Sequence, residues 1–482
     1  FEATVRCCTQ NGIRGGSATV HFPIWHQEIE DIIVLKNNKG TEDNRVRKLD
    51  YSIQLSKLFY ARFIADGEIS LFSPHDVPGL YDAFGTESFD ELYEEYERSD
   101  VPRKTIKAQE LILNLLKERA ETGRIYIMNI DHCNSHSSFT DKVEMSNLCQ
   151  EITLPTKPIQ HIDDETGEIA LCILSAINIG KIRDLSDLES LCDLSVRSLD
   201  ELIDFQGYPV KAAELATRAR RSLGIGYIGL AHYLAKQGVK YDDPESWKMV
   251  HDLTESFQYY LIKSSVNLAK EKGACEFSNR TKYSHGILPI DTYKKDVDEI
   301  VPNKLNCDWE SLREELKQYG IRNSTLTAQM PSESSSVVSN ATNGIEPPRG
   351  YLSIKKSKKG PLKQIVPSYN TLKNNYTLLW DMKGNTGYIN VVAVMQKFFD
   401  QAISGNWSYN PQHFEGSEVP TSVMAQDLLT TYKYGWKTSY YQNTYDVKTD
   451  EVESDTQENQ LDTLIEDIMS SDQEEVCESC AI

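Results

Sequence analysis

A run from Ile169 to Ile177 is apolar at almost every position and constrains the fold more than any other stretch of the chain. Strands that face solvent on one side alternate polar and apolar residues, whereas a continuous apolar run is typical of a strand buried on both faces. The run therefore predicts an α/β architecture built on a parallel sheet or a barrel. Cys172 lies inside the run, and the usual interpretation of such a residue is an inert core cysteine.

Other stretches favour the same class of fold, either as one large unit or as two or three smaller ones. Residue patterns predict strands at Ala18–Phe22, Arg124–Ile130, Asn323–Ala328 and Thr438–Thr444, and helices at Trp25–Lys36, Tyr51–Ile64, Glu91–Arg98, Lys104–Glu121, Val391–Ile403 and Ala425–Tyr434. Helical patterns dominate from Leu185 to Lys272, with a break at Gly224–Gly226. The charged helices at Glu91–Arg98 and Lys104–Glu121 are expected to present solvated faces.

Composition excludes several classes of function. The net charge of -21 argues against wrapping nucleic acid, which requires clustered Lys and Arg. No apolar run is long enough to span a membrane, and no signal peptide is evident at the start. Ten cysteines at irregular spacing, without a secretory leader, favour a reducing compartment and hence the cytoplasm.

Both ends of the chain carry information about its organisation. Phe1 is not an initiator residue, and the chain opens directly into a cysteine- and glycine-containing motif, so we expect the later part of a longer protein. From about residue 446 the composition becomes strongly acidic and offers little to bury, which predicts a disordered tail. Cys477 and Cys480 form a CxxC on that tail and are predicted to act as an exposed thiol–disulfide carrier.

The stretch Ser146–Glu151 is the clearest candidate for chemistry. In an extended backbone Asn147, Cys149 and Glu151 project from the same side, because side chains alternate along a strand. That side offers an amide, a thiol and a carboxylate to one small substrate, a combination suited to hydrogen or proton transfer. The alternative is a surface strand with a chance cysteine.

Two further stretches are candidates for phosphate binding. Residues Pro331, Ser332, Glu333, Ser334 and Ser335 run from a predicted strand into a predicted helix, whose hydroxyls and free backbone amides suit a phosphate. Plain helix capping is the alternative. A glycine-rich loop contains Gln10, Arg14, Gly15 and Gly16, and Arg14 is suited to a phosphate or a base. This loop matches neither the Rossmann nor the P-loop pattern, and a simple glycine-rich turn is its alternative.

The grouping Asp131–His136 invites a zinc interpretation, but no second Cys or His pair follows it at zinc-site spacing. We therefore predict no metal site in this chain.

Five motifs, in this order along the chain, resemble the large, catalytic subunit of class I ribonucleotide reductase, of the aerobic bacterial and phage type. They are Asn147–Glu151, Leu171–Cys172, Pro331–Ser335, Asn343–Gly350 and Tyr440–Thr444. The resemblance covers essentially the whole chain. It implies the C-terminal portion of a ten-stranded α/β barrel with a finger loop through its centre. Residues 1–445 are then a catalytic barrel domain incomplete at its N-terminus, and residues 446–482 a flexible acidic tail.

The resemblance also implies how the site would work. Cys149, as a thiyl radical, would take the 3′ hydrogen of a ribonucleoside diphosphate. Glu151 would accept the 3′-hydroxyl proton, and Asn147 would hydrogen-bond the substrate hydroxyls. Cys172 would be one of two thiols that reduce the 2′ carbon. The turn Pro331–Ser335 would hold the diphosphate.

Partners follow from the same resemblance. Tyr440 and Tyr441 would pass the radical to Cys149 from a small subunit that holds a diiron-tyrosyl radical, with no cofactor bound in this chain. Cys477 and Cys480 would reduce the active-site disulfide and be reduced in turn by thioredoxin or glutaredoxin. The loop with Gln10, Arg14, Gly15 and Gly16 would relay nucleotide effectors, ATP and deoxynucleoside triphosphates, to the substrate base, in a homodimer of large subunits.

The chain departs from the family in lacking its N-terminal portion. With it go the ATP-binding cone, several barrel strands, much of the effector site and the thiol partner of Cys172, so the chain alone is expected to be inactive. Other reductase classes fit less well, because no glycyl-radical motif is visible and a cobalamin enzyme does not need adjacent tyrosines. A non-catalytic fragment that only scaffolds or binds the small subunit is the alternative function. The intact set of Asn147, Cys149 and Glu151 weighs against it.

Overall fold

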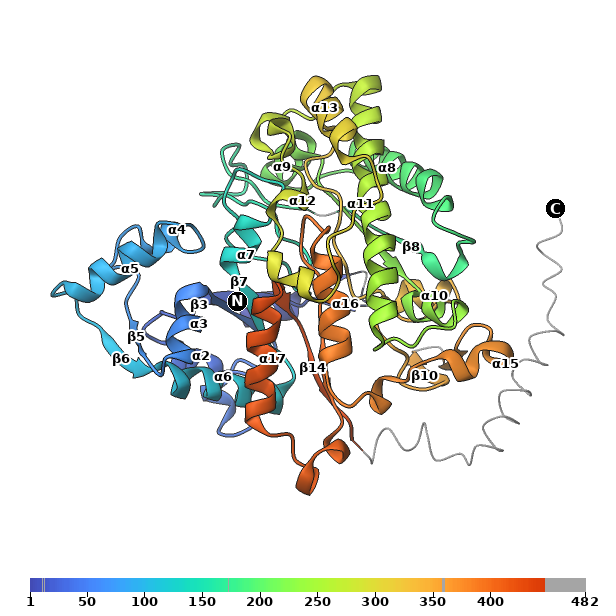
Figure 1. Cartoon of the computed structure of the whole chain (residues 1–482). Coiled ribbons are helices and arrows are strands. Elements are labelled where there is room, and N and C mark those ends of the chain that lie inside the picture. The colour runs from blue at the N-terminus through green and yellow to red at the C-terminus, as the bar shows by residue number, and fades with distance from the viewer. Residues whose placement is uncertain (11, 13, 172, 358–359, 447–482) are drawn as a thin grey trace.

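The computed structural model describes residues 1–10, 12, 14–171, 173–357 and 360–446 of the 482-residue chain (Figure 1). Cys172, Cys477, Cys480 and the predicted acidic tail from residue 447 onward lie outside the described residues. Within the described part, no helix has the length and apolar character needed to cross a membrane.

The first half of the chain builds a four-stranded sheet in the order β13-β7-β4-β3. Its strands are β3 (Thr19–Pro23), β4 (Asp50–Leu55), β7 (Ile125–Asn129) and β13 (Thr438–Ser439). β3, β4 and β7 are parallel, whereas β13 arrives from the far end of the chain and pairs antiparallel with β7. Every residue of β4 and β7 is buried, as expected for the centre of a parallel sheet.

Helices and a small hairpin surround this sheet, on the blue and cyan side of Figure 1. The bounds are α1 (Glu2–Cys7), β1 (Thr9–Gln10), β2 (Arg14–Gly15), α2 (Ile29–Ile33), α3 (Lys57–Ile64), β5 (Glu68–Leu71), α4 (Leu80–Ala83), α5 (Phe89–Arg98), β6 (Lys104–Lys107), α6 (Ala108–Thr122) and α7 (Ile130–Ser135). β5 and β6 form an antiparallel pair apart from the main sheet.

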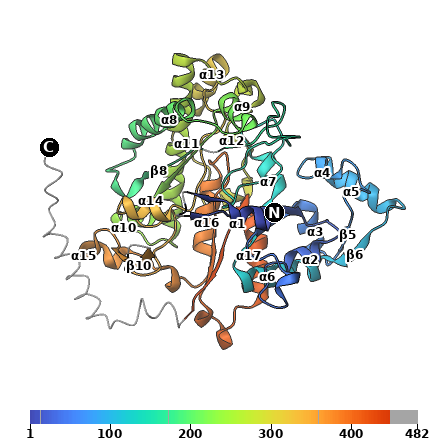
Figure 2. The same cartoon turned by 180° about the vertical axis from the view of Figure 1, so that it is seen from behind.

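A second group of extended segments starts with the parallel pair β8 (Ile173–Asn178) and β9 (Leu223–Ile228). Parallel bridges from Ile225 to Thr327 and from Gln329 to Ile403 continue it through two further segments. The helices that cover it are α8 (Asp187–Phe205), α9 (Lys211–Arg220), α10 (Leu230–Lys236), α11 (Pro244–Lys272), α12 (Pro289–Thr292) and α13 (Trp309–Tyr319). They form the green and yellow side of the molecule, seen from behind in Figure 2.

The C-terminal third, in orange and red in Figure 1, joins these two halves, and part of it lies between them. Its elements are α14 (Glu333–Val338), the antiparallel pair β10 (Leu352–Ser357) and β11 (Gly360–Ile365), α15 (Tyr369–Leu372), α16 (Thr386–Gln396), β12 (Trp407–Tyr409), α17 (Thr421–Lys433) and β14 (Gln442–Thr444). α16 is buried along almost its whole length and occupies the middle of Figure 1. β12 and β14 are parallel neighbours, and β13 carries the chain back to the first sheet.

The predicted α/β class is confirmed, but several local predictions are wrong. The predicted helix at Tyr51–Ile64 begins only at Lys57, because Tyr51–Leu55 belongs to β4, where apolar residues packed on both faces mimic a helical pattern. Similarly, Lys104–Lys107 is strand β6 and the helix follows it. The predicted helix at Trp25–Lys36 shortens to α2.

The prediction of a strand buried on both faces at Ile169–Ile177 is also only partly right. Ile173–Asn178 is a strand, but Leu174 is 43% exposed, so one face of β8 is not buried. In the described part of the chain β8 pairs with β9 on one side, and no strand is recorded along its other edge. An apolar strand at the edge of a sheet leaves part of its surface uncovered, which explains the difference.

Candidate active site

The predicted strand Ser146–Glu151 is in fact a turn. Gln150 N–H donates to Asn147 O at 3.3 Å, and Ser146 Oγ donates to Ile152 O at 2.7 Å, so the chain reverses between them. Gln150 has φ of +71°, in the left-handed region that non-glycine residues rarely adopt. Strand alternation therefore does not bring Asn147, Cys149 and Glu151 together; the turn does.

The side chain of Gln150 is fully buried and holds this turn in place through hydrogen bonds. It accepts a hydrogen bond from Ser52 Oγ at 2.8 Å, and its amide donates to Asn147 O at 3.1 Å. Its amide nitrogen also lies 3.2 Å from Nε2 of His21, whose pKa burial lowers to about 4. A neutral imidazole can accept that bond, so the strained turn is secured by strands β3 and β4. Sequence reasoning missed these three residues, because nothing in their pattern signals the contact.

Glu151 is 2% exposed and sits against Ser404, another residue that the sequence did not single out. Ser404 Oγ lies 3.1 Å from Glu151 Oε2 and 2.5 Å from Cys149 O. Burial raises the pKa of Glu151, while hydrogen bonds from Asn147 and Ser404 partly offset that rise. The turn thus gathers an amide, a thiol and a buried carboxyl within one small volume.

The adjacent tyrosines meet the thiol from the opposite end of the chain. Tyr440 OH donates to Cys149 Sγ at 3.4 Å, and the rings of Tyr440 and Tyr441 stack with centroids 3.8 Å apart. Tyr126 of β7 packs against both rings, at 4.8 and 5.9 Å. Burial, and after it the neighbouring Cys149, raise the pKa of Tyr440 well above its ordinary value, so its phenol stays protonated at neutral pH.

The backbone of the two tyrosines is fixed by a buried cation, Arg119 of α6. Its guanidinium donates to Tyr440 O at 2.7 Å and to Tyr441 O at 3.2 Å, and it lies 4.7 Å from the ring of Trp407. Arg119 is 0% exposed, and burial lowers its pKa to about 10. The prediction that the Lys104–Glu121 helix presents a solvated charged face is therefore wrong at this residue.

A pocket of about 380 Å³ opens beside this cluster. Pro331, Ser332 and Glu333 line it, whereas Ser334 and Ser335 are not among its lining residues. α14 begins there with Ser332 as its first flanking residue, as the sequence predicted. The other walls come from residues 341–350, from the pair β10 and β11, and from Ser404, Asn406, Tyr441 and Asn443. Because Ser404 also contacts the turn, the pocket and the Cys149 cluster share a wall.

The glycine-rich loop forms a small hairpin, with Thr9 opposite Gly15 and Gln10 opposite Arg14. A Cβ on Gly16 would lie 2.4 Å from Val5 O, so no larger residue fits there without a shift. The side chains of Gln10 and Arg14 are outside the described part, so the structure gives no ligand geometry for this loop.

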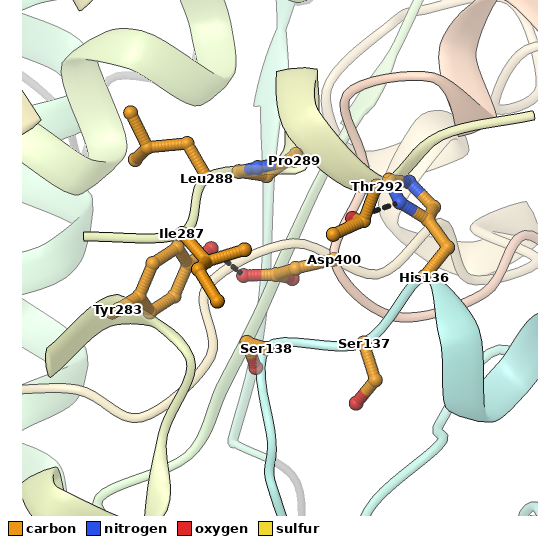
Figure 3. Close-up of a pocket in the computed structure, with 9 residues that line it drawn as sticks. All are labelled: His136, Ser137, Ser138, Tyr283, Ile287, Leu288, Pro289, Thr292 and Asp400. Atoms are coloured by element: carbon orange, nitrogen blue, oxygen red, sulfur yellow. Dashed lines mark hydrogen bonds between the residues drawn. The ribbon is translucent and has the colours of Figure 1, made fainter. Parts of the chain in front are cut away.

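The Asp131–His136 segment takes up structural contacts. His132 Nδ1 lies 3.0 Å from Trp436 O, and His136 binds Thr292 Oγ1 and Gln396 O, both at 2.8 Å. Figure 3 shows His136 at a cavity of only about 10 Å³, beside Asp400, whose carboxylate accepts from Tyr283 OH at 2.7 Å. Protein partners thus occupy both ring nitrogens of His136 and Nδ1 of His132, whereas His132 Nε2 is buried without a hydrogen-bond partner.

In the described part of the chain one group has ligand atoms close enough for a metal, namely His251, Asp252 and Glu255 of α11. Glu255 Oε1 already accepts from Trp309 Nε1 at 3.1 Å and from the backbone N–H of Cys307 at 2.9 Å. These bonds explain its burial without an ion.

Comparison with known proteins decides the family. The family model described as "Ribonucleotide reductase, barrel domain" matches residues 1–442. The chain belongs to this family. The class I ribonucleotide reductase resemblance drawn from five motifs is confirmed at that level.

Named relatives of this ribonucleotide reductase chain are all described as ribonucleoside-diphosphate reductase subunit alpha. The Haemophilus influenzae protein is 58% identical over 92% of this chain and 60% of its own length. The Escherichia coli protein, subunit alpha of reductase 1, is 53% identical over 100% of this chain and 62% of its own length. The enterobacteria phage T4 protein is 46% identical over 95% of this chain and 61% of its own length. The chain thus spans about three fifths of these relatives.

Proposed function

We propose that this chain supplies the thiyl-radical site of a class I ribonucleotide reductase large subunit and reduces ribonucleoside diphosphates to deoxyribonucleoside diphosphates. The observation that carries the proposal is the stack of Tyr441 on Tyr440, with the Tyr440 hydroxyl 3.4 Å from the Cys149 sulfur. Relatives named ribonucleoside-diphosphate reductase subunit alpha support the same reaction.

Radical transfer into the site follows from the contact between Tyr440 and Cys149. A tyrosyl radical at Tyr440 takes a hydrogen atom from Cys149, so the S–H bond breaks, the O–H bond forms and a thiyl radical remains. Since the raised pKa of Tyr440 keeps the phenol protonated, the Tyr440 radical forms when its proton and electron leave together toward the stacked Tyr441. The contact between Tyr440 OH and Cys149 Sγ is then the path by which the hydrogen atom comes from sulfur. The first radical is supplied by the diiron-tyrosyl centre of a separate small subunit.

Reduction of the sugar then uses the remaining groups of the turn. The Cys149 thiyl takes the 3′ hydrogen, forming S–H and leaving a carbon radical. Glu151 accepts the 3′-hydroxyl proton, for which its carboxyl must be ionised, and Asn147 holds the substrate hydroxyls. The bond from the 2′ carbon to its hydroxyl breaks and the hydroxyl leaves as water. Cys172 acts as one of the two thiols that deliver two electrons and two protons for this step and end as a disulfide. Cys149 then returns a hydrogen atom to the 3′ carbon.

The substrate fits the pocket of about 380 Å³ with its diphosphate at Pro331–Ser335, where Pro331, Ser332 and Glu333 line the wall. Its ribose then faces Ser404, which touches both Cys149 O and Glu151. ATP and deoxynucleoside triphosphates act as effectors through the loop containing Gln10, Arg14, Gly15 and Gly16.

Two further partners complete the proposal. Thioredoxin or glutaredoxin reduces Cys477 and Cys480, which in turn reduce the active-site disulfide. Cys477 and Cys480 lie 32 and 35 residues beyond Tyr445 in the sequence. Large subunits associate as a homodimer, and the location is the cytoplasm.

The chain also requires a further N-terminal segment to work. The relatives extend well beyond the part that this chain matches, and β8 carries the half-exposed Leu174 at an edge without a recorded strand partner in the described part. Such a segment would supply the remaining barrel strands and the thiol partner of Cys172. We call the chain preceded by the N-terminal part of the Haemophilus influenzae relative the completed subunit.

The test is Cys149→Ser in the completed subunit, assayed with small subunit, thioredoxin and effector. We expect formation of deoxycytidine diphosphate to fall to background, while the Kd for cytidine diphosphate changes by less than about threefold. Cys307→Ser is the matched control, because Cys307 lies in the segment before α13 and should leave turnover unchanged. Turnover by Cys149→Ser would refute the proposal. A non-catalytic scaffold predicts no turnover by any variant, the unmodified completed subunit included.

A further inference from the structure

Residues Ser404–Trp407, here called the bridging segment, touch several parts of the proposed site in succession. Ser404 contacts the turn at Cys149 O, as described above. Gly405 O accepts from Tyr440 N–H at 2.7 Å. The segment therefore runs along the wall between the nucleotide pocket and the tyrosine pair.

The side-chain amide of Asn406 connects the tyrosine pair to a residue of the pocket. Its Oδ1 accepts from Tyr441 N–H at 3.0 Å, and its Nδ2 donates to Glu346 Oε1 at 2.5 Å. A backbone N–H can only donate and a carboxylate can only accept, so the amide has a single orientation that satisfies both bonds. Asn406, Glu346 and Tyr441 all line the same pocket.

Glu346 is the charge that an incoming nucleotide would meet. It also accepts from Asn343 Nδ2 at 3.2 Å, and burial raises its pKa. Arg349 partly opposes that rise, whereas the negative charge of Glu333, at the predicted diphosphate turn, adds to it. The negative charge of Glu333 already repels the ionised carboxylate of Glu346. A bound diphosphate carries more negative charge, so it would repel this carboxylate more strongly.

Resting on the proposed function, we propose that Asn406 is a positioning residue that couples occupancy of the nucleotide pocket to the backbone of Tyr441. An anion in the pocket repels the Glu346 carboxylate. The Asn406 amide passes that displacement to the Tyr441 N–H and so to the ring stacked on Tyr440. Hydrogen transfer depends steeply on the separation of the reacting atoms, so small shifts of this stack set the rate at which the radical arrives.

Two substitutions separate this coupling from substrate binding. Asn406→Asp keeps an oxygen for the Tyr441 N–H but removes the donor to Glu346 and places two carboxyls against each other. Adding Glu346→Gln to Asn406→Asp restores a donor and an acceptor with the direction of the bond reversed. Asn443→Ala is the matched control, since Asn443 lines the same pocket and its amide bonds Ser408 Oγ at 3.3 Å, away from Glu346.

The readout is the ¹⁹F resonance of 3-fluorotyrosine placed at Tyr441 in the completed subunit, with and without saturating cytidine diphosphate. We expect the nucleotide to shift this resonance, and Asn406→Asp to lose more than about half of the shift while its Kd changes less than about threefold. The double variant rebuilds the bond without the charge at position 346, so it should recover only as much of the shift as Glu346→Gln alone keeps, and Asn443→Ala should keep the shift in full. In turnover assays with Tyr441 unmodified, Asn406→Asp should lower kcat about tenfold with KM within about threefold.

Glu346→Gln alone gives a second test that leaves the amide of Asn406 in place. The bond to Asn406 persists but the repelled charge is gone, so the nucleotide-induced shift should again fall by about half.

A full shift and unchanged kcat in Asn406→Asp would overturn the inference, as would an equal loss in Asn443→Ala. Absence of nucleotide binding by the unmodified completed subunit would instead overturn the proposed function, and this inference with it.

Discussion

The hydroxyl of Tyr440 lies 3.4 Å from the sulfur of Cys149, although 291 positions separate the two residues in the chain. The contact depends on two features that the residue types of the motifs do not reveal. Gln150, in a left-handed conformation, turns Cys149 toward the last strands. Arg119 fixes the backbone of Tyr440 through a hydrogen bond to its carbonyl oxygen.

The two tyrosines can be tested one hydroxyl at a time. In the completed subunit Tyr440→Phe and Tyr441→Phe should each reduce turnover to background, because phenylalanine keeps the stacked ring but has no O–H to exchange. Thermal unfolding midpoints should stay within a few degrees of the unmodified protein. Tyr434→Phe is the matched control, since this partly buried tyrosine follows α17, its hydroxyl donates to Glu299 at 3.4 Å, and it takes no part in the stack of Tyr440 and Tyr441. Normal activity in either stack variant would exclude a radical relay through that residue.

The pH dependence of turnover should report on Glu151. Its carboxyl must be ionised to accept a proton, so kcat/KM should rise with pH through its raised pKa. The Ser404 hydroxyl favours the ionised form and lowers that pKa. Ser404→Ala therefore raises the pKa further, and the rising limb of the profile should move to higher pH.

Ser404→Thr keeps the hydroxyl and serves as the control for the pH experiment; its limb should coincide with that of the unmodified enzyme. If the rising part of the kcat/KM profile lies at the same pH in Ser404→Ala as in the unmodified protein, Glu151 is not the group whose ionisation it reports.

The buried carboxylate of Asp400 should matter for stability. It accepts from the backbone N–H groups of Leu326 and Thr327, both at 2.9 Å, and from Tyr283 OH (Figure 3). Asp400→Ala leaves these donors buried without partners and should lower the free energy of unfolding by about 3 kcal/mol.

Asp400→Asn retains one acceptor oxygen, so its free energy of unfolding should fall less than that of Asp400→Ala. Urea unfolding followed by tryptophan fluorescence measures both variants, with the half-exposed Asp193→Ala as the control. A loss in Asp400→Ala no greater than in Asp193→Ala would show that the contacts of Asp400 contribute little.

Completeness of the catalytic unit is directly testable. The purified chain, mixed with small subunit, dithiothreitol and effector, should give no multiple turnovers, whereas the completed subunit should. The apolar edge at β8 should also make the chain alone associate, seen as a larger mass by light scattering. Repeated turnover by the chain alone would contradict the requirement for a further segment.

Sequence patterns located helices and strands well where the apolar residues followed only one repeat, either that of a helix or that of a strand. Arg124–Ile130 became β7, and the helix start after Pro331 became α14. They failed at β4, where Tyr51–Leu55 is buried on both faces and its apolar residues fit a helical period equally well. They also failed at the turn that holds Cys149, because its geometry depends on Gln150 contacting Ser52 and His21, residues distant in sequence.

The same limit applies to charged residues. Arg119 belongs to a helix rich in charge, and only the tertiary fold reveals that this one cation is buried under two tyrosine carbonyls. By contrast, the motifs with Asn147, Cys149 and Glu151 and with Tyr440 and Tyr441 could be chosen from the sequence through their resemblance to one family; the structure places Tyr440 against Cys149, and the roles of these residues are proposed.

The position of β13 has a consequence for how the protein is made. Asn129 at the end of β7 binds Trp436 O, and 307 residues separate the two. A nascent chain leaving the ribosome must therefore hold β7 at an open sheet edge until almost all of the described chain has been synthesised. The turn that carries Cys149 emerges long before Tyr440 does. During most of translation Tyr440 is therefore not yet present beside the thiol, and the contact between them can form only after the last described strands have been made.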